Sequence, residues 1–145
     1  MQLTTHFSMD ELTASSIALR LCINNQPIPN VQANMLVLAE GLEAVRNLLG
    51  GQPMHIDSAY RCEALNRAVG GAKDSAHEQG FAADFICPTV GKPIDIVRLI
   101  AQSRIDFDQL IQEGTWVHIS FAPTLRRQVL TAIFGPGGTT YREGV

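Results

Sequence analysis

Apolar residues along the chain follow helical spacing in some segments and strand-like spacing in others. Within residues 30–50 they recur every three or four positions, at Val31, Met35, Leu38, Leu42, Val45 and Leu49. This spacing predicts an amphipathic helix that ends at Gly50-Gly51, with Asn30 as its cap. Ser8 and Glu11 have the form of a capping box, which predicts an earlier helix that ends before Asn24.

Two shorter helices are expected later in the chain. Residues 63–69 predict a brief helix that stops at Gly70-Gly71, where glycine suits the end of a helix. Lys92-Pro93 opens another helix, because proline is well tolerated in the first turn. The side chains expected to face inward from this helix are Ile94, Val97, Leu99 and Ile100.

Short apolar runs predict strands at residues 53–60, 81–86, 107–112 and 116–121. Glu113, Gly114 and Thr115 separate the last two runs, a pattern typical of an antiparallel hairpin. Residues 128–134 are expected to add an edge strand, and the Gly-Pro-Gly-Gly stretch after it predicts a loose tail over about residues 135–145. We therefore expect one α+β domain, residues 1–145, with helices packed on one side of a small antiparallel sheet and a cleft across its open face.

Composition narrows the class of protein. The 145 residues are 46% hydrophobic and 17% charged, which excludes a disordered chain, and no apolar run approaches the roughly 20 residues of a membrane span. Membrane insertion is therefore not expected. A net charge of -3 provides no broad cationic surface, so neither nucleic acid nor an anionic membrane is an expected partner. The three cysteines, Cys22, Cys62 and Cys87, are expected to be buried or half-buried free thiols.

The residues with the clearest chemical potential are His77, Asp84 and His118. His77 and Asp84 are seven positions apart with Gly80 between them, so a turn can bring both side chains to one point. Strand alternation places His118 on the same face as Trp116 and Ser120. Two imidazoles and a carboxylate suit zinc, with a fourth position open for water as in catalytic sites. Spacing alone leaves open a loop histidine, a capping carboxylate and a sheet histidine.

Several motifs in order resemble one family. Residues 75–84, SAHEQGFAAD, match the SxHxxGxAxD pattern of the zinc D-Ala-D-Ala metallopeptidases, which include carboxypeptidases, dipeptidases and phage L-alanyl-D-glutamate endolysins. The other landmarks that look similar are Phe7-Ser8-Met-Asp-Glu-Leu12, Ser58-Ala-Tyr60-Arg61, Leu65-Asn66, Gly70-Gly71, Phe107-Asp-Gln-Leu-Ile and Trp116-Val-His118-Ile-Ser120. The resemblance runs from about Phe7 to Leu130 and implies a hedgehog-like fold.

The resemblance also implies roles for individual residues. His77, Asp84 and His118 would hold Zn²⁺. Arg61 would bind the substrate carbonyl or terminal carboxylate and stabilise the oxyanion, a task that suits a rigid, always charged guanidinium. Ser75 matches a serine near bound substrate, although a serine that caps a turn is an equally simple interpretation.

The chain departs from part of the family at the residue expected to act as general base. Many members have an acid three residues before the last histidine ligand, but Thr115 occupies that position and cannot accept the proton. Glu113, five residues before His118, is the preferred base, and Asp108 is the alternative. Of the other histidines, His55 is expected to be half-exposed rather than in the cleft, and His6 to be uninvolved.

The resemblance implies hydrolysis of a peptide bond in the peptidoglycan stem peptide, at a terminal D-Ala-D-Ala bond or an internal L-Ala-D-Glu type bond. The N-terminus has no signal pattern, so we expect synthesis in the cytoplasm and action on the cell wall after release or as a virion-associated protein. A monomer is the working expectation. Two alternatives stay open: a zinc-bearing cell-wall or partner-binding module without catalysis, and a dipeptidase that does not act on the wall.

Overall fold

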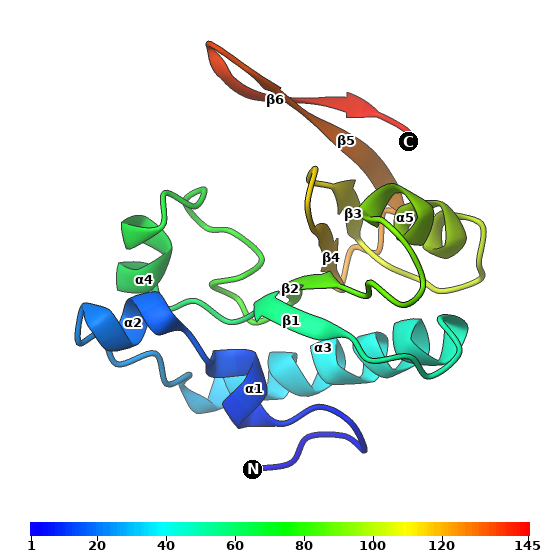
Figure 1. The fold of residues 1–145 in the computed structure, drawn as a ribbon. Helices are drawn as coiled ribbons and strands as arrows, with labels where there is room; N and C mark the ends of the chain where they lie inside the picture. Colours follow the sequence, from blue (N-terminus) through cyan, green and yellow to red (C-terminus); the bar gives the residue numbers. More distant parts are fainter.

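The longest helix, α3 (Pro29–Leu48), lies under one face of a six-stranded sheet (Figure 1). Its predicted apolar stripe is confirmed, because Met35, Leu38, Leu42 and Val45 are fully buried. The helix begins two residues earlier than expected. Pro29 occupies its first turn and Ile28 is the cap, so the prediction that Asn30 caps the helix is wrong.

The structure describes all 145 residues. The other elements are α1 (Met9–Thr13), α2 (Ser16–Arg20), β1 (His55–Ser58), α4 (Glu63–Ala68), β2 (Ala82–Ile86), α5 (Pro93–Ala101), β3 (Gln109–Gln112), β4 (Val117–Ser120), β5 (Gln128–Gly135) and β6 (Gly138–Glu143). This computed structural model has the predicted α+β architecture. No helix combines the length and apolar character needed to cross a membrane.

The single early helix expected between Ser8 and Asn24 is instead the pair α1 and α2. Ser8 caps α1 by accepting a hydrogen bond from the Glu11 amide at 3.1 Å, as the capping pattern predicts. Ser15 then accepts one from the Ala18 amide, also at 3.1 Å, and so starts a new helix. Because Ser15 competes for backbone donors in this way, the chain turns between the two helices.

The strand order in the sheet is β1-β2-β4-β3-β5-β6. All neighbouring strands are antiparallel except β3 and β5, which are parallel, so the expectation of a purely antiparallel sheet is wrong. The reason is the connection after β4. Residues 121–127 carry the chain past β3 to its free edge, where β5 runs opposite to β4 and therefore parallel to β3.

Cross-strand register gives the sheet two different faces. Phe85, Leu110 and Ile119 are fully buried and form part of the core with α3 and α5. Of the α5 residues expected inside, Val97 and Ile100 are buried, Ile94 is half-buried and Leu99 is exposed, because Ile96 takes the inward position instead. The opposite face carries Asp84 directly across from His118, and His118 across from Ile111 on β3.

The loose tail expected over about residues 135–145 is also a wrong prediction. Residues 135–138 make a hairpin turn, with Gly138 at a φ of 109° that glycine adopts without strain. β6 then pairs with β5 along its length, so β5 is an internal strand rather than the edge. Figure 1 shows this hairpin projecting from the sheet above β3 and β4.

The cysteines are all free thiols, as expected. Cys87 is buried and Cys62 half-buried. Cys22 is exposed, which contradicts the prediction for it, because it follows the end of α2 at a φ of 55° rather than within the helix.

Candidate metal centre

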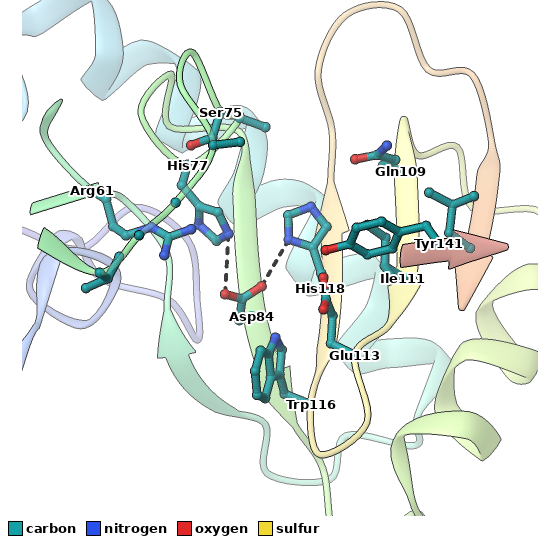
Figure 2. Close-up of a pocket in the computed structure, with 16 residues that line it drawn as sticks. Arg61, Ser75, His77, Asp84, Gln109, Ile111, Glu113, Trp116, His118 and Tyr141 are labelled. Atoms are coloured by element: carbon teal, nitrogen blue, oxygen red, sulfur yellow. Dashed lines mark hydrogen bonds and ion pairs between the residues drawn. The ribbon is translucent and has the colours of Figure 1, made fainter. Parts of the chain in front are cut away.

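His77, Asp84 and His118 converge although 41 residues separate the first from the last. One possible ligand atom from each lies within 4.8 Å of the others. His77 Nε2 is 3.3 Å from Asp84 Oδ2, and His118 Nδ1 is 3.0 Å from Asp84 Oδ1. The two imidazole rings meet edge to face with centroids 5.1 Å apart (Figure 2). The structure thus brings together all three of the predicted ligands.

His77 is held in one orientation by the backbone. Its Nδ1 lies 2.7 Å from the carbonyl oxygen of Ala59, which can only accept, so Nδ1 carries the proton. Nε2 therefore turns a lone pair toward Asp84 and His118. A second group that fixes the tautomer and the ring direction is the usual partner of a metal-binding histidine.

Asp84 is ionised in this environment. Burial alone would raise its pKa, but the adjacent imidazoles of His118 and His77 outweigh burial and hold the pKa well below its ordinary value. His77 is 3% exposed, and burial lowers the pKa of its imidazole, which favours the neutral form. Two neutral imidazole nitrogens and one carboxylate oxygen are a donor set that zinc accepts. The residues present therefore fit a divalent metal, with zinc favoured.

The three side chains lie at the floor of a cleft of about 470 Å³. Arg61, Ser75 and the residues after α4 line one side, and Glu113 and Trp116 line the side nearer β3 and β4. Figure 2 shows Arg61 on the His77 side of Asp84, and Glu113 beside His118. The predicted position of the cleft, on the face of the sheet away from α3, matches this arrangement.

Arg61 faces the cleft with unused hydrogen-bonding capacity. Its Nε is buried and has no hydrogen-bond partner within the protein. Burial lowers the pKa of the guanidinium, and the nearby carboxylates of Asp84 and Glu78 raise it, but the group stays charged. A buried donor without a partner implies an acceptor supplied from outside.

Of the two acids considered as general base, only Glu113 lines the cleft. Burial raises the pKa of its carboxyl, the neighbouring His118 lowers it and Asp84 raises it again. A raised pKa makes Glu113 a better proton acceptor than an exposed glutamate. Asp108 instead binds Arg126 Nε at 2.8 Å and Thr124 Oγ1 at 2.6 Å. Because its oxygens are engaged in this ion pair, Asp108 is not placed to act at the metal centre.

The remaining predictions concern four side chains. Ser75 lines the cleft, and its Oγ also accepts a hydrogen bond from the Glu78 amide at 3.4 Å. The serine therefore caps the turn and also faces the cleft. Trp116, which the sequence places on the same face as His118, lines the cleft. His55 is exposed and lies outside the cleft, with its Nε2 3.3 Å from Asp57 Oδ1. His6 binds Glu43.

The sequence model of the Peptidase M15 family matches residues 5–120, which is most of the chain. The chain belongs to the Peptidase M15 family. It is also 40% identical over 53 residues to the zinc D-Ala-D-Ala carboxypeptidase of Streptomyces albus G. That similarity covers 37% of this chain and 21% of the relative, so the chain corresponds to about a fifth of the relative's length.

Two of the cleft residues that sequence analysis missed lie outside the region matched to Peptidase M15. Leu130 of β5 and Tyr141 of β6 line the cleft beside Gln109 and Ile111 of β3. The sequence did contain a signal, because Thr139, Thr140 and Tyr141 are residues that favour strands. The adjacent glycines and proline obscured this signal, since they also suit a loose tail.

Proposed function

We propose that this protein is a zinc-dependent peptidase that hydrolyses peptide bonds in peptidoglycan stem peptides. The observation that carries the proposal is the convergence of His77, Asp84 and His118 within 4.8 Å at the floor of a cleft. Membership of Peptidase M15 and the name of the Streptomyces relative, a zinc D-Ala-D-Ala carboxypeptidase, support both the metal and the substrate class.

In the proposed reaction His77 Nε2, His118 Nδ1 and an Asp84 carboxylate oxygen would hold the zinc ion. Bound zinc supplies Lewis-acid polarisation of the peptide carbonyl and lowers the pKa of water at the site to about 7. The Glu113 carboxylate takes a proton from the attacking water and delivers that proton to the leaving amine, so the protons of the hydrolysis balance.

Arg61 complements Glu113 from the other side of the metal centre. Its guanidinium donates to the carbonyl oxygen of the scissile bond, where negative charge develops during attack, or to the terminal carboxylate of the substrate. Trp116 provides an apolar wall that limits access of bulk water to the reacting groups.

The preferred scissile bond is the terminal D-Ala-D-Ala bond, with an internal L-Ala-D-Glu type bond as the alternative. The name of the Streptomyces relative favours the first, and the motif resemblance to phage lysins favours the second. In either case the protein would act on the cell wall, after release or as part of a virion.

The test is digestion of purified muropeptides by the zinc-loaded chain, with products identified by mass spectrometry. Glu113→Gln keeps the size of the side chain but removes the base, so kcat should fall roughly 10²- to 10⁴-fold while one zinc per chain is retained. Glu40→Gln, the same change on the exposed surface of α3, is the matched control and should have parental activity. His118→Ala should lose both zinc and activity.

Other outcomes have clear meanings. If the zinc-loaded parent binds muropeptides without cutting them, the binding-module alternative replaces the enzyme. If ordinary dipeptides are cut and muropeptides are not, the substrate class is wrong. Unchanged activity in Glu113→Gln would remove Glu113 as the base.

A further inference from the structure

The C-terminal hairpin of β5 and β6 is firmly attached to the sheet that carries the metal centre. Residues 128–131 of β5 pair with residues 109–112 of β3, and Gln109 Nε2 donates to Gln128 Oε1 at 2.9 Å. β6 pairs with β5 from Gly138 to Glu143. The hairpin therefore continues the sheet beyond β3, and its side chains have defined directions.

Strand alternation places Tyr141 on the cleft face of this hairpin. His118, Ile111 and Leu130 lie opposite one another on three neighbouring strands, so they share that face. Ala132 is two residues beyond Leu130, and its cross-strand partner is Tyr141. Ala132 is 7% exposed, although most of the hairpin is open to solvent. Its small side chain lies on the same face of the strand pair as Tyr141.

The hydroxyl of Tyr141 points toward the metal centre. Figure 2 shows the phenol reaching from β6 in front of Ile111, with its oxygen directed at His118. The side-chain hydrogen bonds of the hairpin are made by Gln128 and Thr131, and none involves Tyr141. A polar group that lines a cleft without a partner in the protein is available to a ligand.

We propose that Tyr141 is a substrate-binding residue whose hydroxyl donates a hydrogen bond to a backbone carbonyl oxygen of the bound peptide, on the side of the metal centre opposite Arg61. This inference rests on the proposed peptidase function and adds a second wall to its substrate site. The family match ends at residue 120, so the hairpin is a feature of this chain beyond the matched region.

The charges around Tyr141 favour a neutral acceptor. Burial and the nearby carboxylates of Glu113 and Asp84 all raise the pKa of the phenol, which keeps it protonated as a donor. The Glu113 carboxylate, which is not a metal ligand, would repel a terminal carboxylate of the substrate at this side. A carboxylate is better received by Arg61, so the substrate would place its C-terminal end toward Arg61 and its preceding backbone under Tyr141.

Tyr141→Phe tests the hydroxyl alone, because the ring and its contact with the hairpin remain. With zinc-loaded full-length protein and a muropeptide that carries a full stem pentapeptide, KM should rise about three- to tenfold, the size expected for one neutral hydrogen bond, with kcat within about twofold of the parent. Zinc content and the melting temperature should not change. Thr140→Val removes a hydroxyl from the neighbouring residue of β6, on the opposite face, and should leave KM unchanged.

Binding is measured separately by calorimetry in the Glu113→Gln background, where turnover is suppressed. Adding Tyr141→Phe should weaken binding of the same muropeptide by the same factor. If the parent hydrolyses muropeptides and Tyr141→Phe changes neither KM nor binding, the role of Tyr141 is refuted and the peptidase function stands. If binding depends on Tyr141 but nothing is hydrolysed, the peptidase function fails and the binding role stands. Absence of any muropeptide binding refutes both.

Discussion

Gly80 lies in the chain between His77 and Asp84 and combines a left-handed backbone conformation with close neighbours. Its φ is 80°, in the left-handed region, and its amide donates to the His77 carbonyl at 3.3 Å. A Cβ at this position would lie 2.9 Å from Met35 Cγ, 2.9 Å from Val31 Cγ1 and 3.1 Å from the Val31 carbonyl oxygen. Gly80→Ala therefore meets both a backbone cost and a steric cost.

The variant Gly70→Ala allows the backbone cost to be measured without the steric cost. The φ of Gly70 is 74°, close to that of Gly80, but a Cβ there would have no neighbour within 4 Å. Gly70→Ala should cost about 1 kcal/mol, because the left-handed conformation costs roughly 1–2 kcal/mol and the stiffer unfolded chain offsets part of it. Gly80→Ala adds overpacking against α3, typically about 1–3 kcal/mol, for a total of about 2–4 kcal/mol.

The assay is urea denaturation followed by circular dichroism, with chelator present so that metal binding does not mask the difference. Gly80→Ala should lower the free energy of unfolding at least about 1 kcal/mol more than Gly70→Ala, and its zinc affinity should fall because the turn from His77 to β2 shifts. Equal losses in the two variants would refute the packing of this turn against Val31 and Met35.

Two further predictions concern charged groups. The Arg126 guanidinium holds the pKa of Asp108 at about 2, below its ordinary 3.8, so the pair stabilises the fold fully above about pH 4 and loses its effect as pH falls through 2. Asp108→Asn should therefore lower the free energy of unfolding by roughly 1–2 kcal/mol at pH 7, a range that allows for the half-exposed Arg126. The loss should be much smaller at pH 2.5, and urea denaturation at both pH values measures it. Arg61→Lys should lower kcat/KM about 10- to 100-fold with zinc content unchanged, because the forked donor pair is lost; parental kcat/KM would show that Arg61 does not contact substrate.

The elements with a strong hydrophobic period were predictable from the sequence. The stripe on α3 and the apolar runs of β2, β3 and β4 are decided by local pattern, and the structure has them where the pattern places them. Their pairing was less predictable. The parallel contact between β3 and β5 depends on how residues 121–127 pack, with Arg127 over the Phe107 ring, and such long-range contacts have no signature in local sequence.

The convergence of His77, Asp84 and His118 could be suggested from motifs but not from spacing. The decisive contacts are non-local: β2 pairs with β4, and the Ala59 carbonyl orients the His77 ring. Tyr141 was missed for the same reason. Its place in the cleft depends on β5 adding to the far edge of β3, and nothing near Tyr141 in the sequence shows this.

The position of Glu113 is decided by strand register rather than by its distance from His118 in the sequence. Ile111 lies directly opposite His118, and Glu113 is two residues further, just past the end of β3, so its side chain emerges on the same face. The Glu113 amide donates to the Trp116 carbonyl at 3.0 Å and closes the hairpin.

Thr115 falls inside that hairpin turn beside Gly114, whose φ is 81°. A carboxylate just past the end of β3 thus reaches the cleft beside His118. The Phe134 ring of β5 would lie 2.9 Å from a Cβ at Gly114, so the C-terminal hairpin packs against the turn that holds Glu113. The hairpin then has two functions in the proposed enzyme: it supports the general base and it presents Tyr141 to the substrate.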